Sequence, residues 1–140
     1  RIFRGKAMTI RYKKPDKKNA LSIIEAAKRD MKFTLSMEIS EEAGPTIVRN
    51  IYECFRMLGD ALLVFKGIKA EDHITQVKEL LKLKVETSRP INLIDNLRRL
   101  RHNVNYYGYK PKLIEIEDAV SLAKSCFSPL LDATNKEINK

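Results

Sequence analysis

A long stripe of apolar residues between positions 48 and 65 constrains the fold more than any other feature of this chain. The apolar residues recur at intervals of three and four, the spacing of one helix face. They are Val48, Ile51, Phe55, Leu58, Leu62 and Phe65. Pro45 suits the first turn of such a helix, and Gly67 suits its C-terminal cap. The segment predicts a helix of about 22 residues, or roughly 33 Å, that packs against other helices along most of its length.

Four further segments show the same helical periodicity. The first runs from about residue 18 to 36 with Asn19 as its predicted cap, and the second opens at Glu71 or Asp72 and is closed before Pro90. The third runs from Pro90 to about residue 106, and the last from about residue 115 into the 130s, where Pro129 should kink the helix or end it early. Residues 135–140 are expected to fray. Short loops between these segments predict an all-α, five-helix up-and-down bundle with a long second helix.

Positive charge is concentrated at the start of the chain. The net charge is +9, and residues 1–18 hold eight basic residues against Asp16 alone. We therefore predict a basic N-terminal arm at 1–17 and a helical domain at 18–140. Even spacing of Ile2, Met8, Ile10 and Tyr12 indicates either a short strand, which would need a partner, or a disordered arm. An arm of this charge can bind phosphate backbones, or it can be a solvated tail.

Composition excludes several classes of protein. With 44% hydrophobic and 32% charged residues and only five Gly and five Pro, the chain is globular and not of low complexity. Cys54 and Cys126 lie in apolar helical patterns without neighbouring ligands, which favours buried thiols over a zinc site or a disulfide. His73 follows Asp72 at a helix start and is predicted to be structural. We expect no metal, no cofactor and no membrane segment, and a cytoplasmic location.

The segment from Leu97 to Lys110 concentrates the polar chemistry of the chain, with three arginines, one of the two histidines, two asparagines and three tyrosines. At about 100° per residue from Leu97, Arg101 falls at about 40°, inside the apolar stripe. Asn105, Arg98 and His102 border the stripe, at about 80°, 100° and 140°. A guanidinium in an apolar stripe must be paired or open into a polar cleft.

Two interpretations of Arg101 follow from this placement. In the first, Arg98, Arg101, His102 and Asn105 line a groove in which arginine binds phosphate, while tyrosines such as Tyr106 and Tyr107 stack on bases. In the second, Arg101 forms an ion pair with a carboxylate, and the other polar groups only complete the surface. The carboxylates available to it are Asp95, Glu53 and Asp60.

The chain resembles HEPN domains over about residues 18–135. The resemblance rests on the order of helices, on Leu58-Gly59-Asp60-Ala61-Leu62-Leu63, on Asp72-His73, and on the segment that contains Arg101. It implies a five-helix bundle that forms a homodimer, and a role in a toxin-antitoxin or defence system, often beside a minimal nucleotidyltransferase partner. Many members are metal-independent ribonucleases.

The motif of these ribonucleases is an arginine followed, after four to six residues, by a histidine. Arg101 matches the arginine, but Tyr106 stands where the histidine is expected, and Arg98 with His102 leaves too few residues between them. The resemblance therefore implies a HEPN-like domain that binds RNA or nucleotide through Arg98, Arg101, Asn105, Tyr106 and Tyr107. One alternative is a ribonuclease in which Arg101 and His102 are catalytic and His102 supplies the acid-base chemistry. Another is a non-catalytic dimerisation or adaptor module.

Overall fold

The computed structural model describes residues 10–140, apart from the side chains of Ile10, Arg11 and His73. Residues 1–9, which hold much of the predicted basic arm and Ile2 and Met8 of the predicted strand, lie outside the described residues. The elements follow in the order β1 (Ile10–Tyr12), α2 (Lys17–Leu35), α3 (Gly44–Lys66), β2 (Ile68–Ala70), α4 (His73–Leu81), α5 (Leu93–Tyr107) and α6 (Leu113–Ile138). The described part of the chain is mostly helical, which confirms the predicted all-α class.

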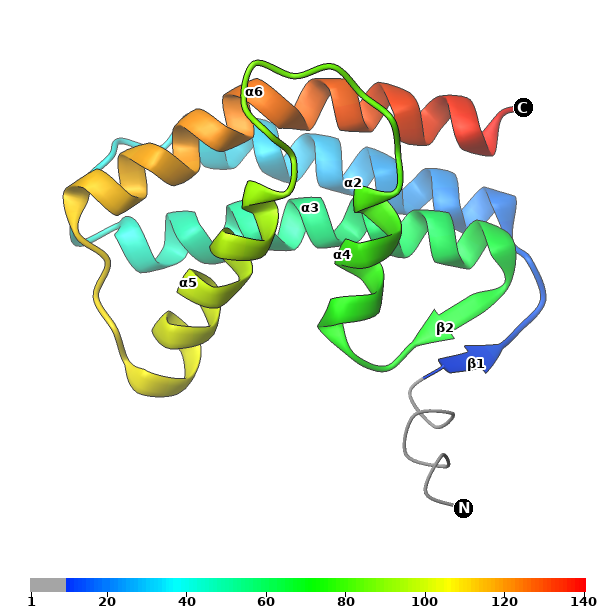
Figure 1. Ribbon diagram of the computed structural model, residues 1–140, viewed down its shortest axis with the longest axis horizontal. Helices are drawn as coiled ribbons and strands as arrows, with labels where there is room; N and C mark the ends of the chain where they lie inside the picture. Colours follow the sequence, from blue (N-terminus) through cyan, green and yellow to red (C-terminus); the bar gives the residue numbers. More distant parts are fainter. Residues whose placement is uncertain (1–9) are drawn as a thin grey trace.

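Three long helices form the body of the molecule, and two shorter ones lie across it. In Figure 1, α2, α3 and α6 run along the long axis, while α4 and α5 cross α3 steeply at different points along it. The core between them is a single cluster centred on α3, whose buried side chains include Ile51, Tyr52, Phe55, Leu58 and Leu62. The arrangement is therefore less regular than a bundle in which all five helices run up and down.

The ends of α3 lie where the sequence places them. Pro45 occupies the first turn, and Gly67 caps the C-terminus with a φ of 77°, which only glycine adopts without strain. The predicted stripe is buried except for Phe65, which is half-buried. Pattern and capping agree along this helix, so the sequence alone predicts its bounds.

A two-stranded antiparallel sheet closes one end of the molecule. β1 pairs with β2 in the register Ile10 with Ala70 and Tyr12 with Ile68. The even spacing around Ile10 and Tyr12 thus belongs to a strand whose partner, β2, the sequence did not predict. The chain then enters α2 at Asp16, whose side chain accepts a hydrogen bond of 2.9 Å from the Asn19 backbone N–H. The cap of α2 is therefore Asp16, and the prediction of Asn19 is wrong.

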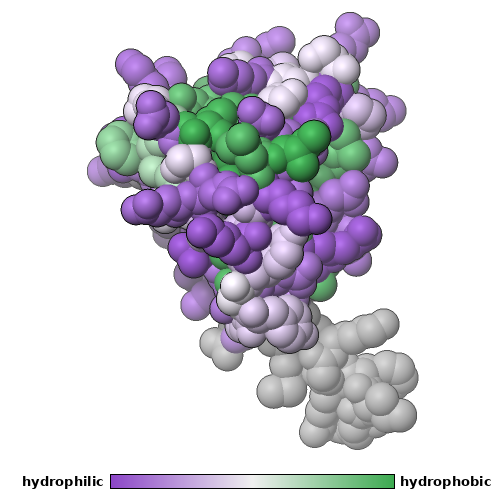
Figure 2. All heavy atoms as spheres, turned by 90° about the vertical axis from the view of Figure 1, so that its left-hand side faces the viewer, coloured by the Kyte–Doolittle hydropathy of each residue, from purple (hydrophilic) through white to green (hydrophobic). Residues whose placement is uncertain are grey.

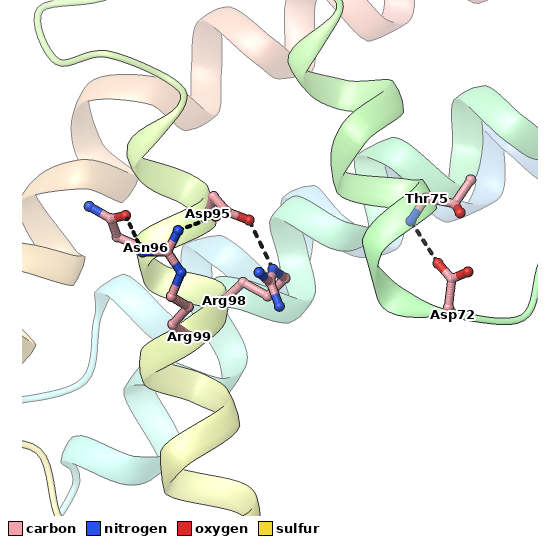
Figure 3. Close-up of polar contacts among 6 residues, drawn as sticks. All are labelled: Asp72, Thr75, Asp95, Asn96, Arg98 and Arg99. Carbon is pink, nitrogen blue, oxygen red and sulfur yellow. Dashed lines mark hydrogen bonds and ion pairs between the residues drawn. The ribbon is translucent and has the colours of Figure 1, made fainter.

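Helix α4 is shorter than its apolar pattern indicates. Asp72 caps it by accepting a 2.7 Å hydrogen bond from the Thr75 backbone N–H, as predicted and as shown in Figure 3. The helix ends at Leu81, and residues 82–92 form an irregular segment that Figure 1 shows passing across α6 before α5 begins. Arg89 holds this segment, since its guanidinium forms an ion pair with Asp118 of α6 at 2.9 Å. The apolar residues of this segment, Leu83, Val85 and Ile91, pack against the core without forming a helix.

Helix α6 does not end at Pro129. It continues to Ile138, so neither an early end nor a frayed tail at 135–138 is observed. Proline removes one backbone donor from the helix, but burial of the residues beyond it offsets that loss. Leu130, Thr134 and Ile138 are all almost fully buried against the core.

Glu79 is a buried carboxylate that joins α4 to α3. Its side chain is 9% exposed and forms ion pairs with Lys66 of α3 and with Lys82, the latter at 3.1 Å. Burial alone would raise the pKa of Glu79, but the hydrogen bonds from the two lysines outweigh burial and lower the pKa below its ordinary value. The ion pair therefore contributes stability above the pKa that Glu79 has in the unfolded chain, and this contribution is lost as the pH falls through the lower, folded pKa.

We expect Glu79→Gln to lower the free energy of unfolding at pH 7 by about 1–2 kcal/mol, because both ion pairs are lost. The loss is no larger than this because both lysines are exposed enough to be rehydrated. The difference from the parent protein should shrink on acidification towards pH 3, where Glu79 becomes protonated in both states. Urea denaturation at the two pH values measures this. A loss of stability that is equal at both would contradict the role assigned to the Glu79 charge.

Candidate nucleic-acid interface

Arg101 lies where α5 crosses α3, and its guanidinium covers an aromatic ring. The guanidinium carbon is 5.3 Å from the centroid of the Tyr52 ring, and Tyr52 itself is fully buried. The Arg101 side chain is half-buried, as its position inside the apolar stripe of α5 predicts. A cation over the face of a tyrosine ring is stabilised by the ring's negative face, by about 0.5–2 kcal/mol. The ring thus provides part of the stabilisation that a carboxylate would otherwise supply.

The carboxylates expected as partners of Arg101 have other partners. Asp95 contacts Arg98 and Arg99 at 2.9 Å each, and Figure 3 shows its carboxylate between the two guanidinium groups. Glu53 contacts Arg56 at 2.6 Å, and Asp60 accepts a hydrogen bond from Gln76. Among the described residues, Arg101 has no ion pair. The interpretation that pairs Arg101 with Asp95, Glu53 or Asp60 is therefore wrong.

A second arginine that has no carboxylate partner among the described residues, Arg49, lies on α3 one turn before Tyr52. The Nε of Arg49 donates a hydrogen bond of 2.8 Å to Oδ1 of Asn105. Asn105 of α5 contacts Arg49 of α3, and Arg101, one turn earlier on α5, contacts Tyr52, one turn later on α3. The two helices thus meet along a line of paired side chains. We call this line the α3–α5 seam, made up of Arg49, Tyr52, Arg56, Arg98, Arg101 and Asn105.

The four arginines of the seam differ in how their charges are compensated. The Glu53 hydrogen bond raises the pKa of Arg56, and the Arg98 hydrogen bond lowers the pKa of Asp95, as expected of ion pairs. Arg49 and Arg101 keep uncompensated charge against the described residues. The seam therefore carries a net positive charge whose guanidinium groups have donors to spare for an anion.

The hydroxyl of Tyr52 is buried in the seam and has no hydrogen-bond partner among the described residues. Burial raises its pKa above the ordinary value, although the charges of nearby arginines, Arg101 first among them, act in the opposite direction. The hydroxyl consequently stays protonated near neutral pH and is a hydrogen-bond donor, not a general base.

His102 and two tyrosines form an aromatic cluster on the outer side of α5. The His102 ring lies 4.7 Å from the Tyr106 ring and 5.8 Å from the Tyr107 ring, centroid to centroid. Tyr106 and Tyr107 are 64% and 75% exposed, so their faces are available for stacking. Successive helical residues point about 100° apart. His102 lines a surface hollow together with Arg98, Arg99 and Asn103, whereas Arg101 lies over the Tyr52 ring.

The sequence-based prediction identified Arg98, Arg101 and Asn105 but missed Arg49 and Tyr52. A signal for them exists, because Arg49, Tyr52 and Arg56 recur at three and four along one edge of the α3 stripe. That edge becomes informative only when α5 is known to cross it. Arg99 is 66% exposed and lies outside the seam.

No group of histidine, cysteine and acidic side chains suited to a metal ion occurs among the described residues. Cys54 and Cys126 are both buried free thiols, and burial raises the pKa of Cys54 to about 12. From residue 10 onward, none of the helices has the length and apolar character needed to cross a bilayer. No known protein family, curated protein or solved structure matches this chain.

Proposed function

We propose that this protein binds single-stranded RNA across the α3–α5 seam and the aromatic cluster beside it. The observation that carries the proposal is Arg101, a half-buried guanidinium held over the Tyr52 ring with no carboxylate partner among the described residues. In this proposal Arg101 and Arg49 bind phosphate groups, while Tyr106 and Tyr107 stack on bases. His102 supports the stacking surface by packing against both tyrosines.

The extent of the surface favours a strand over a mononucleotide. Arg98 and Tyr107 lie about 14 Å apart along the axis of α5, at 1.5 Å per residue, which is longer than one nucleotide occupies. Arginine side chains lie along the first part of this length and two exposed aromatic faces lie at its end, and proteins that bind single strands without strong sequence preference combine the same two kinds of group. Asn105, which holds Arg49, would keep that guanidinium in place.

A HEPN-like identity, in a toxin-antitoxin or defence setting with a nucleotidyltransferase partner, belongs to the same proposal. The five helices, the long α3 and the position of Arg101 support it. Catalysis is not part of the proposal, because Tyr106 occupies the position of the motif histidine and the His102 ring packs against tyrosines. The proposed role is that of an RNA-binding domain.

Arg101→Gln should weaken binding of a fluorescently labelled single-stranded RNA by about tenfold, since a charged hydrogen-bond donor is lost. Arg101→Lys should give an intermediate value, because it keeps the charge but not the planar fork. Fluorescence anisotropy measures these affinities, and gel analysis of the same RNA tests for cleavage.

The matched control is Arg29→Gln on α2, which removes the same charge from a side chain that is 73% exposed. It should change the affinity less than twofold. Equal weakening by Arg101→Gln and Arg29→Gln would mean that only net charge matters, and the seam would not be the binding site. Thermal unfolding of each variant separates loss of binding from loss of fold.

A second candidate function, a homodimerising module, is favoured by an apolar groove between α5 and α6. Its apolar walls are Leu93, Leu97, Leu100, Ile114, Ala119 and Leu122. Figure 2 shows hydrophobic residues gathered in its upper half, on the side of the molecule where α5 and the start of α6 lie. Asn96, Glu115 and Asp118 add polar groups to the lining of this groove.

Ile114, which is 72% exposed, should lie at the centre of such a dimer interface. We expect Ile114→Asp to convert a dimer into a monomer in analytical ultracentrifugation, because burying an unpaired carboxylate opposes association. Ile74→Asp, at a side chain 44% exposed on α4, is the control and should leave the association state unchanged. A parent protein that is monomeric at high micromolar concentration would contradict this candidate.

A further inference from the structure

The C-terminal end of α5 has few residues in the core. Among residues 102–107 Val104 is buried and the other five are exposed, including Tyr106 and Tyr107. In Figure 1 the connection from α5 to α6, residues 108–112, lies at an edge of the molecule. Burial therefore contributes little to the orientation of the two tyrosines to which the proposed function assigns base stacking.

A hydrogen bond between two side chains joins this end of α5 to the start of α6. The Tyr109 hydroxyl donates it to Oε1 of Glu115, at 2.6 Å. The same oxygen accepts a hydrogen bond of 2.9 Å from the backbone N–H of Lys112, which caps the first turn of α6. The bond to Glu115 raises the pKa of Tyr109, because the carboxylate favours the protonated phenol. The phenol therefore stays a donor at neutral pH.

The backbone of Tyr109 belongs to the C-terminal cap of α5. Gly108 takes a φ of 63°, the left-handed conformation that ends many helices. The N–H groups of Gly108 and Tyr109 both donate to the carbonyl oxygen of Asn103, the latter at 3.1 Å. Tyr109 is thus fixed to α5 by its main chain and to α6 by its side chain, two residues after Tyr107.

We propose that Tyr109 is a positioning residue for the RNA-binding surface. Through Glu115 it holds the last turn of α5, and with it the Tyr106 and Tyr107 rings, in the orientation that stacks on bases. A side chain that is already ordered loses less conformational entropy on binding, so held rings bind more tightly than free ones. In this role Tyr109 does not itself touch the RNA. The inference rests on the proposed function, which assigns stacking to the two tyrosines.

Tyr109→Phe removes the hydroxyl and keeps the ring. It should weaken binding of the labelled single-stranded RNA by about threefold to tenfold, because the stacking rings are ordered only on binding. The loss should fall on stacking, so the preference for intact RNA over an RNA of equal length with abasic sites should decrease. The slope of log Kobs against log salt concentration should stay unchanged, because the phosphate contacts remain. Fluorescence anisotropy measures all three quantities.

Tyr12→Phe is the matched control, the same substitution at a side chain that is 85% exposed on β1. It should change neither the affinity nor the preference for intact RNA. An equal loss of affinity for intact and abasic RNA in Tyr109→Phe would overturn the proposal, since stacking would not be what Tyr109 supports. Thermal unfolding of both variants shows that folded proteins are compared.

Hydrogen–deuterium exchange of the free protein tests the positioning without RNA. The backbone amides of residues 105–109 should exchange about threefold to tenfold faster in Tyr109→Phe than in the parent protein, while those of α3 should not change. A parent protein that does not bind RNA would overturn the proposed function. Binding that Tyr109→Phe does not weaken, or exchange that it does not accelerate, would overturn the role of Tyr109 alone.

Discussion

Replacing Gly59 by alanine is expected to destabilise the protein by about 2–3 kcal/mol or more, although alanine is the better helix former. The backbone of α4 lies directly against α3 at this residue. A Cβ at Gly59 would lie 1.9 Å from the backbone oxygen of Gln76 and 2.7 Å from its carbonyl carbon. Backbone cannot rotate out of the way as a side chain can, so the two helices would have to separate. Urea denaturation followed by circular dichroism measures the loss.

Gly44→Ala is the matched control for this prediction. A Cβ at Gly44 would lie 2.4 Å from Cδ1 of Ile116, the far end of a flexible side chain that can adopt another rotamer. Its cost should therefore be smaller, about 1 kcal/mol. If Gly59→Ala were as stable as the parent protein, the close contact between α3 and α4 would be wrong. The geometry of Asp60 and Gln76, which depends on that contact, would then be wrong as well.

Phe55→Ala is expected to lower the free energy of unfolding by about 3–5 kcal/mol, which would leave a domain of this size barely folded. The Phe55 side chain is fully buried at the centre of α3, and its ring contacts the Phe127 ring of α6 edge to face at 5.8 Å. Truncation removes both the apolar transfer energy and this aromatic contact, and it leaves a cavity between the two long helices.

Phe33→Ala removes the same group from a side chain that is 67% exposed on α2. It should change stability by less than about 0.5 kcal/mol. Thermal and chemical denaturation of both variants under identical conditions would measure the difference. Similar losses at the two positions would contradict a core centred on α3.

The sequence predicts the helices of this fold well and their tertiary partners poorly. Helix α3 is predicted because an apolar stripe, Pro45 and Gly67 agree on its extent. Strand β2 is missed because three residues, Ile68–Ala70, are too few to show a period, and its pairing with β1 is a long-range contact. Helix α4 is overextended because apolar residues continue beyond Leu81 in a segment that packs without being helical.

The sequence likewise predicts the position of a candidate site residue better than the contacts that the residue makes. The helical angle of Arg101 is a local property, so its position inside the apolar stripe could be predicted. The identity of what it contacts could not, because Tyr52 is reached only through the crossing of α3 and α5. The predicted carboxylate partners were reasonable by charge, yet Arg98, Arg99, Arg56 and Gln76 engage them instead. Competition among arginines for carboxylates depends on the complete set of neighbours.

The salt dependence of RNA binding tests the central proposal most directly. Each phosphate neutralised on a single strand contributes about 0.7 to the slope of log Kobs against log salt concentration. If Arg49 and Arg101 each bind a phosphate, Arg49→Gln/Arg101→Gln should reduce the magnitude of that slope by about 1.4, whereas Arg29→Gln should leave it unchanged. A slope that is the same in the parent protein and in the double variant would contradict the assignment of the α3–α5 seam as the RNA-binding surface.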